Sequence, residues 1–502
     1  MTLQNASVTS GDPVYWDENS GIGCHSMGCP SQAYESGLGT IPSEAFDITG
    51  NNCYDEFKKM PAPQPAQTAQ AQSFKVIYNF TGGQDGAGPG GLTIDKAGNF
   101  YGTTAGGGYT AGSCGSGGCG AVYKLWRQAS GWVLNALYNF KGTDYGDGDQ
   151  PSSRVIVGPD GTLYGVTSHG GTGTNCGGAC GTVFNLKPAA TACRTALCGW
   201  TETVLYSFKG YASGDRGAGS CSLQESQNRT TRQSLRLPAD GGDGAYPSGD
   251  LVFDQAGNIY GTTVLGPGPP NGYCGGCENG ACGLIYQLAP SNGGWEESIV
   301  LAFDDYGGGS VPQSGIIFDK AGNSFGTTTF SYGNGEFGTV FGDGGSLFSF
   351  PSDGSEGVFP VGGLMLDASG NLFGTTSGGR DPGDGCYYGG GTVFELPYPY
   401  YQEYFTELVG FGGSEGPTDR LIMDVGGSLY GATVYDGPYD KGSVFKLTPG
   451  KSGWTYTNLY DFTGGADGGG PSGLTWDANG NLWGTASGGG AYGYGVIFEI
   501  TP

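Results

Sequence analysis

Residues 95–104 read Asp-Lys-Ala-Gly-Asn-Phe-Tyr-Gly-Thr-Thr, and variants of this phrase recur along the chain. Further copies occupy residues 254–263, 319–328, 367–376, 424–433 and 477–486, and a shorter form fills residues 158–167. The seven central glycines are Gly102, Gly165, Gly261, Gly326, Gly374, Gly431 and Gly484, spaced 63, 96, 65, 48, 57 and 53 residues apart. Repeats of this length indicate one supersecondary unit per copy, stacked against its neighbours.

Each copy predicts four β-strands, here called A to D. In the first repeat the strands are expected at residues 91–95, 99–104, 120–125 and 132–140. Strands A and B are joined by a tight turn in which Asp95 bonds its own backbone while Gly98 accepts a positive φ. The aromatic residue before each central glycine is expected to pack between units, and the glycine to admit a neighbouring sheet. Four strands repeated seven times predict an all-β, seven-bladed β-propeller.

The two ends of the repeat region predict how the ring closes. The last repeat lacks a strand D, whereas residues 74–80, Phe-Lys-Val-Ile-Tyr-Asn-Phe, form a strand D with no partners before it. Pairing the two completes the seventh blade and removes an exposed sheet edge. The expected organisation is therefore a Cys-containing irregular segment (1–60), a Pro/Gln/Ala linker (61–73) and the propeller (74–502).

Composition excludes several classes of protein. Glycine contributes 105 of 502 residues, which argues against a helical bundle because glycine destabilises helix interiors. The 8 Trp, 31 Tyr and 25 Phe supply an extensive core. A net charge of −25 argues against nucleic acid as a partner. No apolar run reaches the roughly 18 residues of a membrane-spanning helix, so no membrane span is expected.

The 14 cysteines favour local disulfides over a metal site. Many lie a few residues apart in glycine-rich stretches, as in disulfide-bonded proteins of oxidising compartments. A zinc site at Cys274, Cys277 and Cys282 lacks a nearby fourth ligand. The expected disulfide-bonded set is Cys24, Cys29, Cys114, Cys119, Cys176, Cys180, Cys193, Cys198, Cys274 and Cys282, with Cys277 as the alternative partner of Cys282. The pairing of Cys53, Cys221, Cys277 and Cys386 stays open. An extracellular or cell-surface location follows, although residues 1–20 show no secretion signal.

The last repeat carries a family resemblance. Residues 459–486 contain Leu-Tyr-Asp-Phe-Thr-Gly-Gly, Gly-Leu-Thr-Trp-Asp and Gly-Asn-Leu-Trp-Gly-Thr-Ala, and residues 495–500 read Gly-Val-Ile-Phe-Glu-Ile. This pattern resembles the GloVer-type tandem repeat of secreted bacterial choice-of-anchor proteins. It is also similar to the repeats of sensor-kinase and NHL propellers. Over residues 74–502 the resemblance implies an exported, surface-associated propeller, with no catalytic residues to transfer.

Candidate ligand-binding residues lie in the long B–C loops. In a propeller the B–C and D–A connections share one face, which we call the loop face, and the insertion 211–246 falls on it too. Tyrosine rings stack on sugars while neighbouring acids bond hydroxyls. The tyrosines expected to bind ligand are Tyr109, Tyr273, Tyr387, Tyr388, Tyr435 and Tyr492, and Tyr332, Tyr439 and Tyr494 lie in equivalent loops. Packing within the loops is the structural alternative.

Carboxylates and one histidine complete the candidate residues. A carboxylate precedes the proline of most D–A loops, and these side chains are expected to ring the channel mouth: Asp85, Asp147, Asp243, Glu356, Glu415 and Asp467. Calcium is the cation such oxygen ligands would hold, and Asp144, Asp147 and Asp149 are the best set for it. Capping of turns is the alternative. His169, in a B–C loop, is the weak catalytic candidate.

Three functions follow from these patterns. The first is an extracellular module that binds a glycan or a protein on the loop face. The second is a structural subunit of a surface assembly that self-associates through residues 1–73. The third is a secreted polysaccharide lyase or hydrolase, which needs a convergent acid–base pair. Binding without catalysis is the favoured reading.

Overall fold

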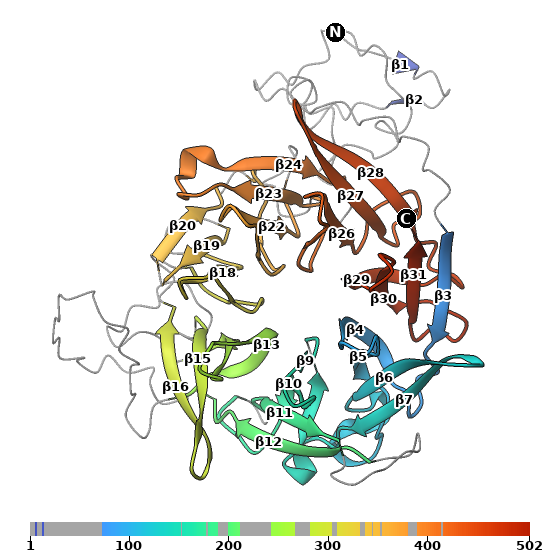
Figure 1. The fold of residues 1–502 in the computed structure, drawn as a ribbon, viewed down its shortest axis with the longest axis vertical. Coiled ribbons are helices and arrows are strands. Elements are labelled where there is room, and N and C mark those ends of the chain that lie inside the picture. Colours follow the sequence, from blue (N-terminus) through green and yellow to red (C-terminus); the bar gives the residue numbers. More distant parts are fainter. Residues whose placement is uncertain are drawn as a thin grey trace, which may run out of the picture.

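The computed structural model describes residues 6–7, 13–14, 73–151, 153–176, 179–188, 199–210, 242–266, 282–303, 309–331, 337–343, 345–351, 354–379, 389–412 and 415–501. Seven antiparallel sheets surround a central axis, with strand A innermost and strand D outermost in each (Figure 1). The predicted seven-bladed β-propeller is therefore confirmed.

Blades one to three are formed by residues 87–302. Blade one comprises β4 (Ala87–Ile94), β5 (Phe100–Gly106), β6 (Ala121–Gln128) and β7 (Gly131–Asn139). Blade two comprises β8 (Gly148–Pro151), β9 (Ile156–Val157), β10 (Leu163–Gly170), β11 (Thr182–Lys187) and β12 (Thr201–Ser207). Blade three comprises β13 (Ala245–Phe253), β14 (Ile259–Leu265), β15 (Leu284–Ser291) and β16 (Gly294–Ala302).

Blades four to seven repeat this order. Blade four comprises β17 (Ile317–Phe318), β18 (Ser324–Thr328), β19 (Thr339–Gly342) and β20 (Gly345–Ser349). Blade five comprises β21 (Met365–Leu366), β22 (Leu372–Thr376), β23 (Thr392–Leu396) and β24 (Thr406–Gly410). Blade six comprises β25 (Ile422–Met423), β26 (Leu429–Thr433), β27 (Ser443–Gly450) and β28 (Gly453–Asp461). Blade seven comprises β29 (Gly469–Trp476), β30 (Leu482–Gly488), β31 (Val496–Thr501) and β3 (Ser73–Asn79).

Short elements lie outside this framework. Three 3-10 helices are described, η1 (Gly112–Gly117), η2 (Thr143–Tyr145) and η5 (Gln402–Tyr404). Near the N-terminus β1 (Ala6–Ser7) pairs with β2 (Pro13–Val14). The rest of the predicted segment 1–60 and the linker before residue 73 lie outside the described residues. None of the described helices is long and apolar enough to cross a membrane.

Blade two departs from the expected four strands. Its inner strand is split into β8 and β9, and both parts pair with β10. Between them, Ser153 and Arg154 bond other blades instead. The Ser153 carbonyl accepts from Thr103 of blade one, and the Arg154 guanidinium reaches Asp419 of blade six.

Strand β3 closes the ring as expected. It pairs antiparallel with β31, from Ser73 opposite Thr501 to Asn79 opposite Val496. The last blade thus combines three strands from the C-terminal end with one that precedes blade one (Figure 1). The outer edge of β31 is covered, which protects it from pairing with another chain.

The repeated A–B turn is built by its aspartate. Asp95 Oδ1 accepts from the backbone N–H groups of Ala97 and Asn99, at 2.8 and 2.9 Å. Its Oδ2 accepts from the side chains of Asn99 and Tyr101, at 2.8 and 3.0 Å. Gly98, at φ +81°, occupies the left-handed position that the turn requires. The predicted turn chemistry is confirmed.

The aromatic residue before each central glycine contacts an aromatic residue of the next blade. These contacts occur at all seven junctions between blades: Tyr101–Trp200, Tyr164–Phe253, Tyr260–Phe318, Phe325–Tyr400, Phe373–Trp454, Tyr430–Trp476 and Trp483–Phe100. Ring centroids are 4.3–6.2 Å apart, the range of favourable aromatic pairs. The expectation that these residues pack between blades is confirmed.

Threonine hydroxyls reinforce five of the junctions. The first threonine of the phrase donates to an inner backbone carbonyl of the following blade at 2.8–3.3 Å. The pairs are Thr103 with Ser153, Thr262 with Ser314, Thr327 with Gly362, Thr375 with Asp419 and Thr485 with Gly90. In blades two and six Val166 and Ala432 occupy this position.

The central glycine makes room for its own blade, not for the neighbouring one. Gly102 lies opposite Tyr123 of strand C, and a Cβ atom on it would come within 2.3 Å of the Tyr123 hydroxyl oxygen. Gly484 has the same relation to Phe498. The expectation that this glycine admits a neighbouring sheet is therefore wrong, because the large aromatic ring from strand C of the same blade lies across it.

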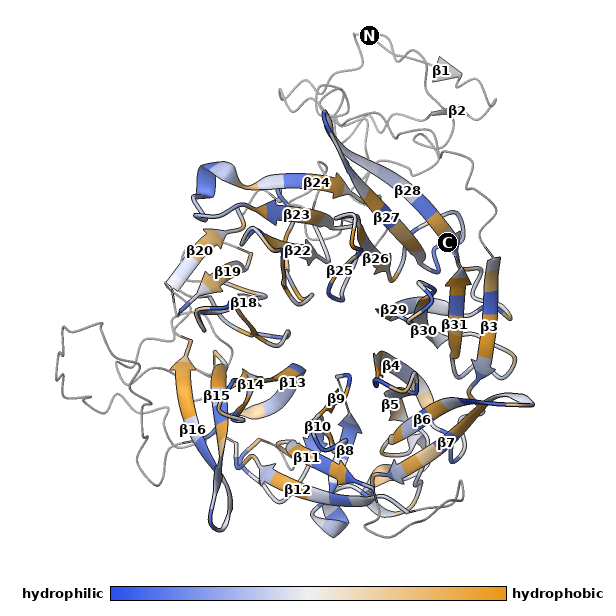
Figure 2. Cartoon of the chain, viewed as in Figure 1, coloured by the Kyte–Doolittle hydropathy of each residue, from blue (hydrophilic) through white to orange (hydrophobic). Residues whose placement is uncertain are grey.

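Figure 2 shows apolar residues along the strands and hydrophilic residues at the tip of the β15–β16 hairpin.

Trp483→Ala is expected to destabilise the closing junction. Trp483 is 1% exposed and contacts both Phe100 and Trp132 of blade one, so its loss leaves a cavity there. Core Trp→Ala changes cost about 3–5 kcal/mol, measurable by urea denaturation. Tyr398→Ala, at a side chain 66% exposed, is the matched control and should change stability by less than about 1 kcal/mol. Equal effects of both changes would contradict the role of this junction.

Candidate functional site

Two disulfides restrain B–C loops on the loop face. Cys114 bonds Cys119 in blade one, and Cys176 bonds Cys180 in blade two. Both pairs match the prediction. Cys282 of blade three is also disulfide-bonded, and its predicted partners, Cys274 and Cys277, lie outside the described residues. Cys24, Cys29, Cys53, Cys193, Cys198, Cys221 and Cys386 also lie outside them.

Exposed tyrosines lie on the loop face of three consecutive blades. B–C and D–A connections leave from the same end of each blade because adjacent strands are antiparallel. The exposed side chains are Tyr435 and Tyr439 in blade six, Tyr492 and Tyr494 in blade seven, and Tyr145 in the D–A connection after blade one, at 41–62% exposure. We call this set the tyrosine arc. Of the remaining candidates, Tyr109 is partly exposed, and Tyr273, Tyr332, Tyr387 and Tyr388 lie outside the described residues.

At one end of the arc, Tyr109 and Tyr145 form a pair. Their hydroxyl oxygens are 3.1 Å apart and their rings meet edge to face. Asp144 accepts the Ser113 N–H at 2.8 Å and thereby ties η2 to the loop that contains Cys114. The hydrogen bond between the two hydroxyls is the main cause that raises the pKa of Tyr109. The pair is thus an aromatic surface on a restrained loop.

The aspartates of four D–A loops cap turns. Each accepts the hydroxyl of a tyrosine on the outer strand and the backbone N–H three residues after that tyrosine. The tyrosine–aspartate pairs are Tyr78–Asp85, Tyr138–Asp147, Tyr206–Asp243 and Tyr460–Asp467. These carboxylates therefore face the outer strands instead of ringing the channel mouth. Glu356 and Glu415 lie in equivalent connections.

The three carboxylates considered for calcium have different partners. Asp144 faces Ser113, Asp147 bonds Tyr138, and Asp149 lies opposite His169 in the β8–β10 ladder. Within the described residues, no group of three or more His, Cys, Asp or Glu side chains is placed to hold a metal ion.

His169 lies in a polar environment at the end of β10. Its Nδ1 is 2.9 Å from Ser168 Oγ, and its ring is 5.1 Å from that of Tyr246. Ser168 donates its own proton to the Gln150 carbonyl at 3.0 Å, so its oxygen is left to accept from Nδ1. Burial raises the pKa of Asp149, which the nearby His169 opposes. In this arrangement the contact between His169 and Ser168 helps to hold the start of the loop.

Two half-buried glutamates lie beside the turn-capping aspartates. Burial, followed by the charge of Asp147, raises the pKa of Glu202 to about 8. Burial, followed by the charge of Asp243, raises the pKa of Glu297 to about 7. The two sites are equivalent, because each glutamate lies on an outer strand next to the preceding D–A connection. Neighbouring lysines, Lys141 and Lys209, partly offset these shifts.

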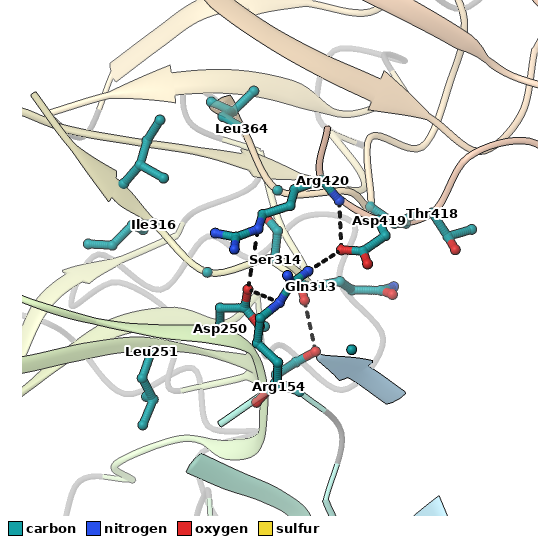
Figure 3. A pocket seen from close by; sticks show the side chains of 18 of the residues that line it. Arg154, Asp250, Leu251, Gln313, Ser314, Ile316, Leu364, Thr418, Asp419 and Arg420 are labelled. Atoms are coloured by element: carbon teal, nitrogen blue, oxygen red, sulfur yellow. Dashed lines mark hydrogen bonds and ion pairs between the residues drawn. The ribbon is translucent and has the colours of Figure 1, made fainter. Parts of the chain in front are cut away.

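A second group of charged residues lies on the propeller axis. Arg154 Nε contacts Asp250 Oδ2 at 2.7 Å, and Arg154 Nη2 contacts Asp419 Oδ1 at 2.9 Å (Figure 3). Arg420 Nε lies 3.9 Å from the same Asp250 oxygen. These four residues, the axial charge cluster, come from blades two, three and six. Asp419 also accepts the Gly473 N–H of blade seven at 2.6 Å, so the cluster joins four blades.

Charge complementarity keeps the cluster ionised. Burial alone would lower the pKa of Arg154, but Asp250 and Asp419 raise it. Burial would raise the pKa of Asp419, but Arg154 lowers it. The second arginine is less well compensated, because Arg154 is the main cause that lowers the pKa of Arg420.

Sequence reasoning missed this cluster, although a signal was present. Directly before the first buried apolar residue of each inner strand, four blades have glycine, namely Gly91, Gly315, Gly363 and Gly473. Blades two, three and six have Arg154, Asp250 and Arg420 at this position. A charged residue in place of a repeated glycine was therefore the signal in the sequence that these three blades differ from the others at the axis. The glycines leave the space, since a Cβ atom on Gly91 would lie 3.3–3.4 Å from Arg154.

Comparison with known families identifies the repeat. Residues 346–502, which include blades five to seven, match the model of the Gloeobacter/Verrucomicrobia repeat. The resemblance stated from the repeat phrase is thereby confirmed for this part of the chain. No curated protein matches the chain.

Several solved structures match this chain at low sequence identity. The extracellular domain of a putative one component system from B. thetaiotaomicron is 10% identical over 85% of this chain, with a TM-score of 0.46. This chain spans 40% of the length of that structure. The PQQ-bound aldose sugar dehydrogenase from Streptomyces coelicolor is 12% identical over 87% of this chain and 98% of its own, with a TM-score of 0.39. Likeness at this level bears on neither ligand nor activity.

The double variant Glu202→Gln/Glu297→Gln is expected to be more stable than the parent protein at high pH only. A glutamate whose pKa rises on folding stabilises the folded state as long as its carboxyl group stays protonated. This stabilisation is complete below the pKa of the unfolded state, about 4.3, and is lost as the pH rises through the pKa of the folded state, about 7 to 8. Glutamine cannot ionise and avoids that loss. The expected melting temperature is roughly 2 °C or more above the parent at pH 9 and unchanged at pH 5. The exposed neighbour Glu296→Gln is the control. A difference in melting temperature that does not vary with pH would contradict the raised pKa of these two glutamates.

Proposed function

We propose that this chain is an extracellular binding module that holds a glycan on its loop face. The observation that carries the proposal is the tyrosine arc, which presents exposed rings on blades six, seven and one of the same face. Aromatic faces stack on the apolar faces of sugar rings, and acids bond the hydroxyls at their edges.

Carboxylates lie close to the rings of the arc. Asp144 adjoins the Tyr109–Tyr145 pair, and its charge contributes to the raised pKa of Tyr109. In blade six, the exposed Asp440 directly follows Tyr439 in the sequence. A ligand across the arc would therefore meet hydrogen-bond acceptors as well as rings. This chemistry suits a neutral, hydroxyl-rich polymer.

Restraint of the loops supports the same function. The disulfides in blades one and two limit the freedom of long glycine-rich loops, which lowers the entropy lost when a ligand binds. Disulfides form in oxidising compartments, which supports an extracellular location. Restrained aromatic loops on a closed ring of blades suit the binding of an extended ligand.

Removing rings from the arc is expected to weaken glycan retention. The variant Tyr435→Ala/Tyr439→Ala/Tyr492→Ala loses three stacking surfaces, so retention on cell-wall and polysaccharide particles should fall about tenfold or more. The matched control is Tyr398→Ala/Tyr401→Ala, which removes two exposed tyrosines from the C–D connection of blade five, on the opposite face. The control should retain glycan like the parent protein.

The same samples separate the alternatives. Retention equal in both variants would contradict binding at the arc. Release of oligosaccharides would instead support the lyase or hydrolase reading and direct attention to His169. Absence of retention together with a large particle in native size measurements would support assembly through residues 1–73. Capture of a protein instead of a polysaccharide would change the ligand class.

A further inference from the structure

The axial charge cluster lines a cavity of about 280 Å³. Inner segments from all seven blades contribute to its wall, from Gly90 and Gly91 in blade one to Ser472 in blade seven. Leu251, Ile316 and Leu364 also line it, with side chains only 2–4% exposed, beside the charged side chains (Figure 3). Its volume is at the lower end of small-molecule pockets, which suits a ligand of one small ring or chain.

Arg154 brings an unused donor into this cavity wall. Its side chain is 4% exposed, and two of its three nitrogens are occupied by Asp250 and Asp419. Among the described residues, Arg154 Nη1 has no hydrogen-bond partner, and neither has the buried Ser153 Oγ next to it. Buried donors without acceptors are costly, so such groups mark where a ligand atom would be stabilised.

Arg420 supplies the accessible cation of the cluster. Its side chain is 42% exposed, and its nearest carboxylate oxygen, on Asp250, is 3.9 Å away and already bonded to Arg154. Both carboxylate oxygens of Asp419 already accept hydrogen bonds, from the Arg154 side chain and from the backbone N–H groups of Arg420 and Gly473. Arg420 therefore lies beside another cation without a close carboxylate of its own. An incoming anion would compensate it.

The balance of charges limits which anion fits. Two arginines and two aspartates are neutral together, so one added negative charge is tolerated better than two. Asp250 and Asp419 also form part of the wall and would repel a dianion while accepting hydrogen bonds from ligand hydroxyls. A planar carboxylate matches the guanidinium fork of Arg420 and its bidentate geometry.

We infer that the axial cavity binds a small hydroxylated monocarboxylate, such as a single sugar acid, with its carboxylate on Arg420 and Arg154 Nη1. Its hydroxyls bond Ser153 and Asp250, both of which line the cavity. This site is separate from the tyrosine arc and does not depend on glycan binding there.

Calorimetric titration of the full chain with sodium D-glucuronate and sodium D-gluconate tests the inference. D-Glucose and inorganic phosphate, at matched ionic strength, probe the neutral and dianionic alternatives. Saturable binding of at least one sugar acid at one site per chain is expected, with glucose and phosphate at least ~10-fold weaker. Absence of saturable binding for both sugar acids, or tighter binding of phosphate, would overturn it.

Substitution of Arg420 locates the site. Arg420→Gln should weaken sugar-acid binding at least ~10-fold and leave glycan retention unchanged, since the arc is untouched. The fold should tolerate this change because the side chain is partly exposed and has no close ion pair. Arg127→Gln, at an exposed arginine of β6, is the matched control and should bind like the parent. Equal affinity in Arg420→Gln and the control would refute the placement.

Discussion

Contact between an aromatic side chain of one blade and an aromatic side chain of the next is the interaction on which the whole ring depends. A single four-stranded sheet cannot bury its faces alone, so each blade gains its core only from its two neighbours. The contact is present at every junction, including the closing one, where Trp483 meets Phe100. The blade that contains Trp483 is completed by β3, a strand that comes from before blade one. Stability is therefore a property of the closed ring.

The axial charge cluster joins the blades by a different kind of interaction, a network of ion pairs. The aromatic contacts join blades that are neighbours in the ring, whereas Arg154 of blade two also reaches Asp419 of blade six across the centre. Buried ion pairs contribute little net stability, since desolvation offsets the attraction. Apolar residues would fill the axis at lower cost. The charged side chains occupy space left by glycines of other blades. We interpret them as groups that recognise a ligand, not as groups that stabilise the fold.

Antiparallel strands separate the two tasks of the molecule. The strands and the short A–B turns repeat with little variation because the packing of neighbours constrains them. The B–C and D–A connections all emerge at the other end, where they vary in length without disturbing a junction. The two described disulfides and the five tyrosines of the arc thus lie on one face. The same topology that closes the core assembles the candidate binding surface.

The sequence by itself determined the strand order, the number of blades, the closure by residues 74–80 and two disulfides. Each is encoded locally, by turn chemistry, spacing or a few residues between cysteines. The sequence did not reveal the hydrogen-bond partners of the D–A aspartates, because an aspartate that caps a turn and one that faces solvent occur in the same sequence pattern. Only the tertiary structure decided that Asp147 bonds an outer-strand tyrosine and that Arg154 meets Asp419. Those two are 265 residues apart, and whether they meet depends on how seven blades close around one axis, which no local pattern specifies.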